Sequence, residues 1–152
     1  MFYIYAAEEK DIDELNRIAY ESEAYWGYDP EFMEKFKIIY RITEDYIRTN
    51  PTFVLAKGNC IIGFYSLLIN DEEIELEFFY ILPRYIGKGY GKKMWEHLIG
   101  YCKEVGIKSF CFVTSPQAKG FYEKMGAVKI DEVESLIRKE RKIPKLKFEI
   151  NN

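Results

Sequence analysis

The 152-residue chain lacks the features that mark several large classes of protein. It has one histidine and three cysteines, and Cys60, Cys102 and Cys111 do not show the spacing of zinc ligands. An odd number of thiols in apolar contexts gives no disulfide framework, so we expect buried reduced thiols, no metal site and a cytoplasmic location. No apolar run approaches the roughly 18 residues of a membrane span, and the first residues lack the pattern of a secretory signal.

The chain also lacks a large excess of either positive or negative charge. The 22 Lys and Arg residues and the 25 Asp and Glu residues are mixed along the chain, and the formal net charge is -3. Proteins that bind nucleic acid need a basic surplus on one face, so we expect neither nucleic acid nor a membrane as a partner. The weak acidity mildly favours cationic acceptors.

What is present is the pattern of a packed globular protein, with 48% hydrophobic and 17% aromatic residues. The length predicts one domain over residues 1–152. Alternating or continuous apolar runs predict strands, and apolar residues at helical spacing predict helices. The expected strands are residues 2–6, 52–57, 60–69, 73–82, 108–113, 127–137 and 146–150. The expected helices are residues 11–24, 30–48 and 116–125, with a further helix that follows a glycine-rich loop and ends at Gly106.

That loop joins strand 73–82 to the helix that ends at Gly106, and it carries Gly87, Gly89 and Gly91 at alternate positions. The first turn of a helix has backbone N–H groups without intrahelical partners and carries partial positive charge. Glycine lets the backbone approach a ligand closely, and Lys88 adds positive charge. The loop therefore predicts a binding site for a phosphate-bearing cofactor, with an ordinary flexible turn as the alternative.

Two well-known phosphate motifs do not fit this loop. The dinucleotide fingerprint requires Gly-x-Gly-x-x-Gly in an N-terminal βαβ unit, and both the spacing and the position differ here. The Walker pattern Gly-x-x-x-x-Gly-Lys-Ser/Thr does not occur. A different kind of nucleotide-binding protein stays open as a third reading, which competition between coenzyme A and ATP would test.

Two blocks of sequence resemble the GNAT acetyltransferase superfamily. Its acetyl-CoA loop, Arg/Gln-x-x-Gly-x-Gly/Ala, is similar to the segment that runs from Ile86 to Gly91, with Ile86 at the usual Arg or Gln position. A second family pattern, Asn-x-x-Ala-x-x-Phe-Tyr-x-x-x-Gly-Phe, resembles the segment from Ser115 to Ala127. Here Ser115 replaces Asn and Ala127 replaces Phe, but the Phe-Tyr pair that ends in Tyr122 is retained.

The resemblance implies an α/β (α+β) fold with a central mixed, mostly antiparallel sheet of about seven strands, flanked by about four helices. It implies acetyl-CoA as cosubstrate, coenzyme A as product, and transfer of the acetyl group by direct attack from a primary amine of a small molecule or a peptide. The cofactor-binding residues that it implies are Phe79, Ile81, Ile86, Gly87, Lys88, Gly89, Tyr90, Gly91, Ser115 and Lys119.

Such a reaction needs a base, an oxyanion donor and an acid. The resemblance assigns the acid to Tyr122, whose ordinary pKa near 10 keeps its hydroxyl protonated. Alternation places Glu73, Glu75 and Glu77 on one face of their strand, and Glu77 lies nearest the loop. Glu77 is therefore the expected base, with Glu75 or solvent as alternatives. A backbone N–H near residues 79–81 is the expected oxyanion donor.

Other features allow two interpretations each. Trp26 and Tyr28 lie in the region that forms the acceptor wall in relatives, and with Glu75 they are the expected substrate-binding residues. The alternative is an aromatic staple at a helix corner. His97 is expected to be structural. A catalytically inactive module that binds acyl-CoA as a sensor or partner is the alternative function, and the C-terminal strands are candidates for forming a homodimer.

Overall fold

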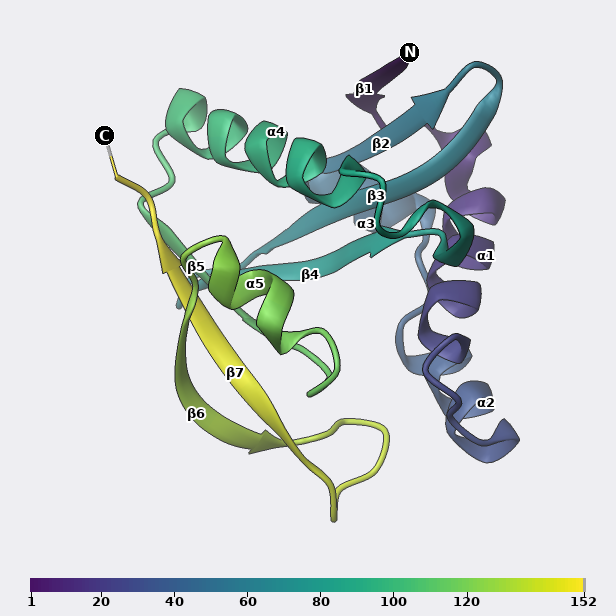
Figure 1. Cartoon of the computed structure of the whole chain (residues 1–152), viewed down its shortest axis with the longest axis vertical. Coiled ribbons are helices and arrows are strands. Elements are labelled where there is room, and N and C mark those ends of the chain that lie inside the picture. The colour runs from purple at the N-terminus through teal and green to yellow at the C-terminus, as the bar shows by residue number, and fades with distance from the viewer. Residues whose placement is uncertain (152) are drawn as a thin grey trace.

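The computed structural model describes residues 1–151 and contains a seven-stranded sheet flanked by helices (Figure 1). The strands are β1 (Phe2–Ala6), β2 (Thr52–Lys57), β3 (Cys60–Ile69), β4 (Ile74–Ile81), β5 (Ser109–Val113), β6 (Val128–Glu134) and β7 (Lys142–Glu149). They lie in the order β1-β2-β3-β4-β5-β7-β6, with β4 and β5 parallel and the other neighbours antiparallel.

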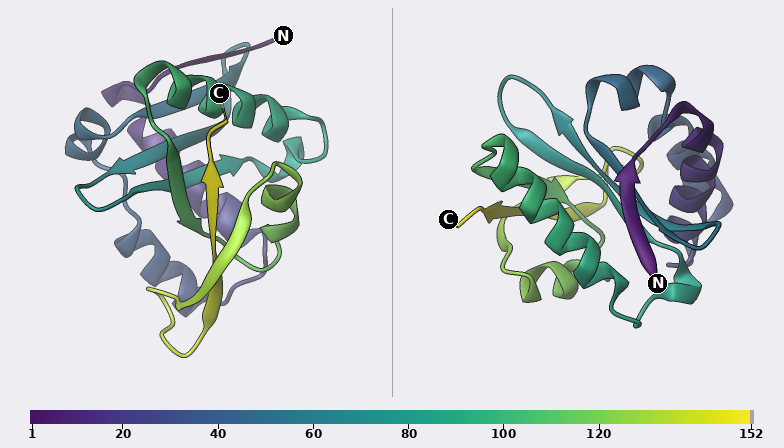
Figure 2. Two further views of the ribbon diagram at one scale, coloured as in Figure 1. Left: turned by 90° about the vertical axis from the view of Figure 1, so that its left-hand side faces the viewer. Right: turned by 90° about the horizontal axis from the view of Figure 1, so that it is seen from above.

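The helices cover both faces of this sheet (Figure 2). They are α1 (Ile12–Ala24), α2 (Pro30–Ile39), α3 (Glu44–Thr49), α4 (Tyr90–Val105) and α5 (Lys119–Lys124), with two short 3-10 turns, Glu9–Asp11 and Pro83–Tyr85. One buried cluster lies under α4 and α5 and includes Trp95 and Leu98, and the other lies under α1 and α2 and includes Leu15 and Phe36. The expected fold class is confirmed.

The helix expected over residues 30–48 is instead two helices. The backbone of Ile42 donates to Asn16 Oδ1 (2.8 Å), and Asn16 Nδ2 donates to the Ile42 carbonyl (3.0 Å). The Thr43 hydroxyl accepts from the Tyr46 amide (3.2 Å) and caps α3. Because a side chain on α1 binds both backbone groups of Ile42, the chain leaves the helical path there and buries the Ile42 side chain. The described residues thus form five α-helices where about four helices were expected.

The strand β4 contains a bulge at Glu77. Ser66 of β3 pairs with Phe78, but the next residue, Leu67, pairs with Leu76, so Glu77 is an extra residue on β4. Strict alternation predicts that Leu76 and Phe78 share a face. The bulge overturns that prediction, because Leu76 belongs to the cluster under α4 and α5 and Phe78 to the cluster under α1 and α2.

The neighbours β4 and β5 separate after one paired position. Their parallel register pairs Glu75 with Cys111 and no other residues of the described chain. Beyond that point the two strands diverge, so the later part of β4 has no neighbouring strand on that side (Figure 1). Two antiparallel groups of strands, β1 to β4 and β5 to β7, are therefore joined in the sheet at one position.

Smaller differences concern element ends and one thiol. The strand expected at residues 127–137 ends earlier, at Glu134, because residues 135–141 form the hairpin loop. The strand expected at 146–150 begins four residues earlier, because Lys142 already pairs with Glu134. Cys102 and Cys111 are buried free thiols as expected, whereas Cys60 is exposed beside the β2–β3 turn. None of the described helices combines the length and apolar character that crossing a membrane requires.

Replacing Asn16 by Ala tests the cause of the break between α2 and α3. The substitution leaves the N–H and C=O of Ile42 without partners, so we expect the free energy of unfolding to fall by about 2 kcal/mol or more. Arg17→Ala is the matched control on the same helix, since its ion pairs to Glu14 and Glu21 are exposed and contribute about 1 kcal/mol at most. Urea denaturation measures both variants, and an equal loss in their free energies of unfolding would contradict this explanation.

Candidate active site

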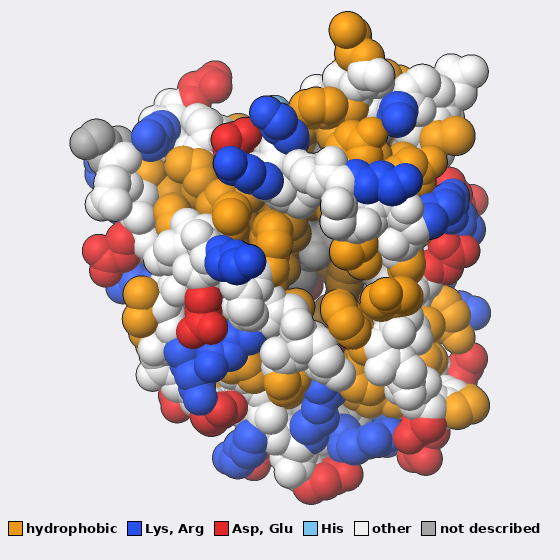
Figure 3. Space-filling model, viewed as in Figure 1, with side chains coloured by type: hydrophobic (Ala, Val, Ile, Leu, Met, Phe, Trp, Pro, Cys, Tyr) orange, Lys and Arg blue, Asp and Glu red, His pale blue; other side chains and the backbone are white. Residues whose placement is uncertain are grey.

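A cavity of about 740 Å³ opens where β4 and β5 separate. Its walls come from α1 and α2, from β4, from the glycine loop, from residues 112–118 with α5, and from the loop between β6 and β7. Figure 3 shows a hollow in this face with hydrophobic side chains around it. The opening in the sheet thus brings together segments from most of the chain.

The glycine loop forms one end of this cavity. Gly87 and Gly89 have φ values of +82° and +88°, a region that residues with a Cβ rarely adopt, and a Cβ at either position would meet no atom within 4 Å. The first helical hydrogen bond of α4 runs from the Lys93 amide to the Gly89 carbonyl (3.2 Å). The amides of residues 90–92 precede it and have no intrahelical partner, so the loop ends in a set of available N–H donors.

Gly91 serves a different purpose. It lies inside α4, and a Cβ there would approach the Phe121 ring of α5 to 3.1 Å. Its lack of a side chain therefore sets how closely α4 and α5 pack, and flexibility of the loop does not explain it. Phe121 precedes Tyr122, so this contact connects the loop to the expected acid.

The structure separates the expected cofactor-binding residues into two groups. The side chains of Lys88, Tyr90 and Lys119 do not line the cavity: Lys88 lies over the Tyr85 ring, Tyr90 packs edge-on against Phe2, and Lys119 pairs with Glu123. The residues that do line it are Phe79, Ile81, Ile86, Gly87, Gly89, Gly91 and Ser115.

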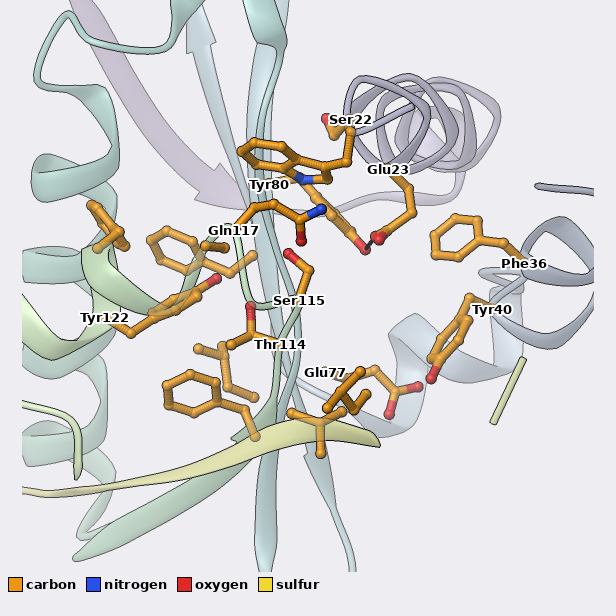
Figure 4. A pocket seen from close by; sticks show the side chains of 18 of the residues that line it. Ser22, Glu23, Phe36, Tyr40, Glu77, Tyr80, Thr114, Ser115, Gln117 and Tyr122 are labelled. Atoms are coloured by element: carbon orange, nitrogen blue, oxygen red, sulfur yellow. Dashed lines mark hydrogen bonds between the residues drawn. The ribbon is translucent and has the colours of Figure 1, made fainter. Parts of the chain in front are cut away.

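Glu77 and Glu75 both line the cavity, and Figure 4 shows the Glu77 carboxylate pointing toward Tyr40, which directly follows α2. Burial, with a smaller contribution from the charge of Glu75, raises the pKa of Glu77 to about 7. A carboxylate with such a pKa can take up and release a proton near neutral pH. Glu73 lies apart from this pair because Lys145 Nζ donates to its carboxylate (3.1 Å).

The Tyr122 ring is buried on the opposite wall, and its hydroxyl points into the cavity (Figure 4). Aromatic neighbours hold the ring, with centroid distances of 4.7 Å to Phe112 and 5.8 Å to Phe79. Burial, and to a lesser degree the charge of Glu23, raises the pKa of Tyr122 above its ordinary value. The hydroxyl is therefore protonated at neutral pH.

Sequence analysis missed a half-buried pair in the same cavity. The Tyr80 hydroxyl donates to Glu23 Oε2 (2.8 Å), and both side chains line the cavity (Figure 4). Burial raises the pKa of Glu23, while the hydrogen bond from Tyr80 and the charge of Arg141 partly oppose that effect. The available signal was position: Glu23 follows Ala19 by four residues, which puts a carboxylate on the apolar stripe of α1.

Trp26 and Tyr28, the residues expected on the acceptor side, both line the cavity. Tyr28 stacks on Phe32 at 4.1 Å between centroids, so it also supports the helix corner that was the alternative interpretation. The loop between β6 and β7 lies against this corner, where Arg138 pairs with Asp29 (2.8 Å). Residues of this loop line the cavity beside Tyr28, on the expected acceptor side, and sequence analysis did not recognise them as part of the site.

His97 lies outside the cavity. Its Nδ1 and the Tyr65 hydroxyl are 2.8 Å apart, its ring packs on Phe53, and burial lowers its pKa. A structural role is what this geometry supports. Among residues 1–151, no group of three or more His, Cys, Asp or Glu side chains is arranged to hold a metal ion.

Comparison with known families agrees with this geometry. The model of the Acetyltransferase (GNAT) family matches residues 12–127. The chain therefore belongs to the GNAT acetyltransferase family, and the resemblance seen in its sequence is confirmed. Comparison with curated protein sequences gave no match.

Solved structures share the fold over nearly the whole chain. PaiA N-acetyltransferase from Thermoplasma acidophilum, in complex with coenzyme A, has a TM-score of 0.83 at 20% identity and covers 98% of this chain and 99% of its own. Ribosomal-protein-S18-alanine N-acetyltransferase from Escherichia coli has a TM-score of 0.74 at 17% identity, with coverages of 100% and 96%. A GNAT acetyltransferase from Elizabethkingia anophelis with acetyl-CoA bound has a TM-score of 0.67 at 16% identity, with coverages of 97% and 97%.

Replacing Glu77 by Gln tests its raised pKa. A carboxyl group whose pKa rises on folding contributes stability at low pH, and this contribution is lost as pH rises toward the folded pKa. We therefore expect the wild type to lose stability relative to Glu77→Gln between about pH 4.5 and about pH 7. Urea denaturation at several pH values measures this difference. Glu34→Gln, at an exposed position on α2, is the control, and a pH trend shared by both variants would refute the assignment.

Proposed function

We propose that the protein is an N-acetyltransferase that moves the acetyl group of acetyl-CoA to a primary amine of a small molecule or a peptide. The observation that carries this proposal is that Glu77 and Tyr122 open on one cavity whose end is formed by the free amides of α4. Membership of the GNAT family supports acetyl transfer in general, and the coenzyme A and acetyl-CoA complexes of two solved relatives support the cosubstrate.

The residues at the cavity fit acetyl-CoA. The amides of the glycine loop and of the first turn of α4 would hold the pyrophosphate, because Gly87 and Gly89 present no Cβ and the helix end favours negative charge. Ile86, half exposed, supplies no hydrogen bond of the kind that Arg or Gln gives at this position, so the backbone carries the binding. The exposed edge of β4 near Phe79 and Ile81 offers backbone groups to the rest of the cofactor and to a developing oxyanion.

The side chains divide the proton transfers between them. Acetyl-CoA supplies an activated acetyl group on sulfur. Glu77 accepts the proton of the amine, directly or through water, with Glu75 as a nearby alternative. Tyr122 donates the proton that the departing thiolate needs. Attack by the amine forms the C–N bond as the C–S bond breaks, and the two groups lie on opposite walls of one cavity.

A cofactor-binding module without turnover is the second candidate. The absence of Arg or Gln at Ile86 favours it, while the raised pKa of Glu77 and the open hydroxyl of Tyr122 favour the enzyme.

Binding of the cosubstrate is tested by thermal shift with acetyl-CoA, coenzyme A and ATP. A ligand at 100 times its Kd should raise Tm by about 5 to 10 °C. We expect a rise with the two coenzyme A species only, and a smaller one in Gly89→Ala, where φ is +88°. Gly100→Ala, in the interior of α4 with open space around it, should keep the full rise. Absence of any rise with both coenzyme A species would refute the proposal.

Turnover is tested by Tyr122→Phe. The variant removes the acid but keeps the ring packing, so we expect kcat to fall about a hundredfold or more with unchanged affinity for coenzyme A. Tyr101→Phe removes a hydroxyl from α4 outside the cavity and should retain full activity. If Tyr122→Phe turns over as fast as Tyr101→Phe, Tyr122 is not the acid. If the wild type binds acetyl-CoA but acetylates no amine, the module without turnover is correct.

A further inference from the structure

Arg141 lines the acceptor-side half of the cavity and has no carboxylate partner in the described structure. One of its guanidinium nitrogens, Nη2, donates to the Tyr28 hydroxyl (2.7 Å), and the group lies over the rings of Tyr28 and Phe32, at 4.8 Å and 5.8 Å from their centroids. No carboxylate oxygen of residues 1–151 lies within 4.0 Å of it. Its charge reaches Glu23 at longer range, but Glu23 Oε2 already accepts from Tyr80.

The neighbouring Arg138 provides a comparison on the same loop. It also lies over Phe32, at 5.4 Å, but it does not line the cavity and both oxygens of Asp29 accept from it (2.8 and 3.1 Å). Arg138 is therefore neutralised within the protein and attaches the loop to the start of α2. Arg141 adds a second cation that this attachment does not require.

The backbone holds Arg141 in place. The Ser135 amide donates to the Arg141 carbonyl (2.9 Å), and the Arg141 amide donates to the Arg138 carbonyl (2.9 Å). The buried Ser135 hydroxyl accepts from the amides of Ile137 and Arg138 (both 3.2 Å). These bonds fix the loop, and the hydrogen bond to Tyr28 holds the guanidinium at the cavity wall, which reduces the entropy lost when it binds a ligand.

A half-buried guanidinium among aromatic rings is poorly solvated, and contacts with the ring faces offset only part of that cost. The planar group has five N–H donors in a geometry that matches a carboxylate, and just one of them is used by Tyr28. The surrounding wall is apolar, from Phe36 and Ile39 of α2 and Ile137 and Ile143 of the hairpin. The acceptor side therefore combines a cation, an apolar wall and the carboxylate of Glu77.

We propose that Arg141 binds a carboxylate on the acceptor, so that the acceptor is an amino acid with an apolar body. Its amine lies toward Glu77, its carboxylate lies at the Arg141 guanidinium, and its apolar part contacts the aromatic wall. This inference rests on the proposed N-acetyltransferase function and makes its substrate specific.

The test compares each acid with the amine that lacks only its carboxylate. The pairs are phenylalanine with 2-phenylethylamine, leucine with 3-methylbutylamine, and 6-aminohexanoate with pentylamine. For at least one pair, kcat/KM of the wild type should favour the acid by about tenfold to a hundredfold, as expected for hydrogen bonds to a charged group. Arg141→Gln should abolish this preference. Arg138→Gln, the control on the same loop, should retain it.

Two results would overturn the inference. One is an equal kcat/KM for acid and amine in every pair. The other is a loss in Arg141→Gln that both members of a pair share equally, because that loss would show that Arg141 only supports the hairpin.

A binding measurement separates this inference from the proposed function. Calorimetry of the acids with the coenzyme A-loaded protein should show binding that weakens at least tenfold in Arg141→Gln. Such binding without any acetyl transfer would reject the transferase and retain the carboxylate site. No binding of any of the three acids would reject the site.

Discussion

The single paired position between β4 and β5 is the constraint on which the rest of the structure depends. A sheet that continued past Glu75 and Cys111 would use the backbone groups of β4 in a ladder and leave no room for a cavity. Because the strands separate, the edge of β4 is exposed, and helices and loops from both sides reach one opening. Trp95 and Phe79 pack edge-on in the core beneath it and support the strand that has lost its neighbour.

The two halves of the cavity differ in their electrostatics. At the glycine loop, N–H donors and the end of α4 favour an anionic ligand. On the acceptor side, burial raises the pKa values of Glu23 and Glu77, so their protonation depends on the ligand and on pH. Arg141 is the cation of that side. An anionic cosubstrate at one end and an amine at the other are the ligands that this distribution of charge suits.

Much of the fold and part of the site could be predicted from the sequence. Alternating and continuous apolar runs predicted all seven strands, and apolar residues at helical spacing predicted most of the helices. The spacing of Gly87, Gly89 and Gly91 located the loop. The break at Ile42 was missed because Asn16, which causes it, lies 26 residues earlier in the chain. The bulge at Glu77 was missed because alternation assumes a regular ladder. Arg141 was missed because its position on the cavity depends on how a distant hairpin folds back onto α2.

The contact between Gly91 and Phe121 has a consequence for the shape of the cavity. Gly91 lies in α4, directly after the loop, and Phe121 adjoins Tyr122 in α5, so the contact joins one end of the cavity to the wall that carries Tyr122. A side chain at position 91 would push the Phe121 ring away by a few tenths of an ångström. Such a shift would move Tyr122 relative to the amides of the loop, so the fit of a long ligand along the whole cavity depends on the size of a single residue.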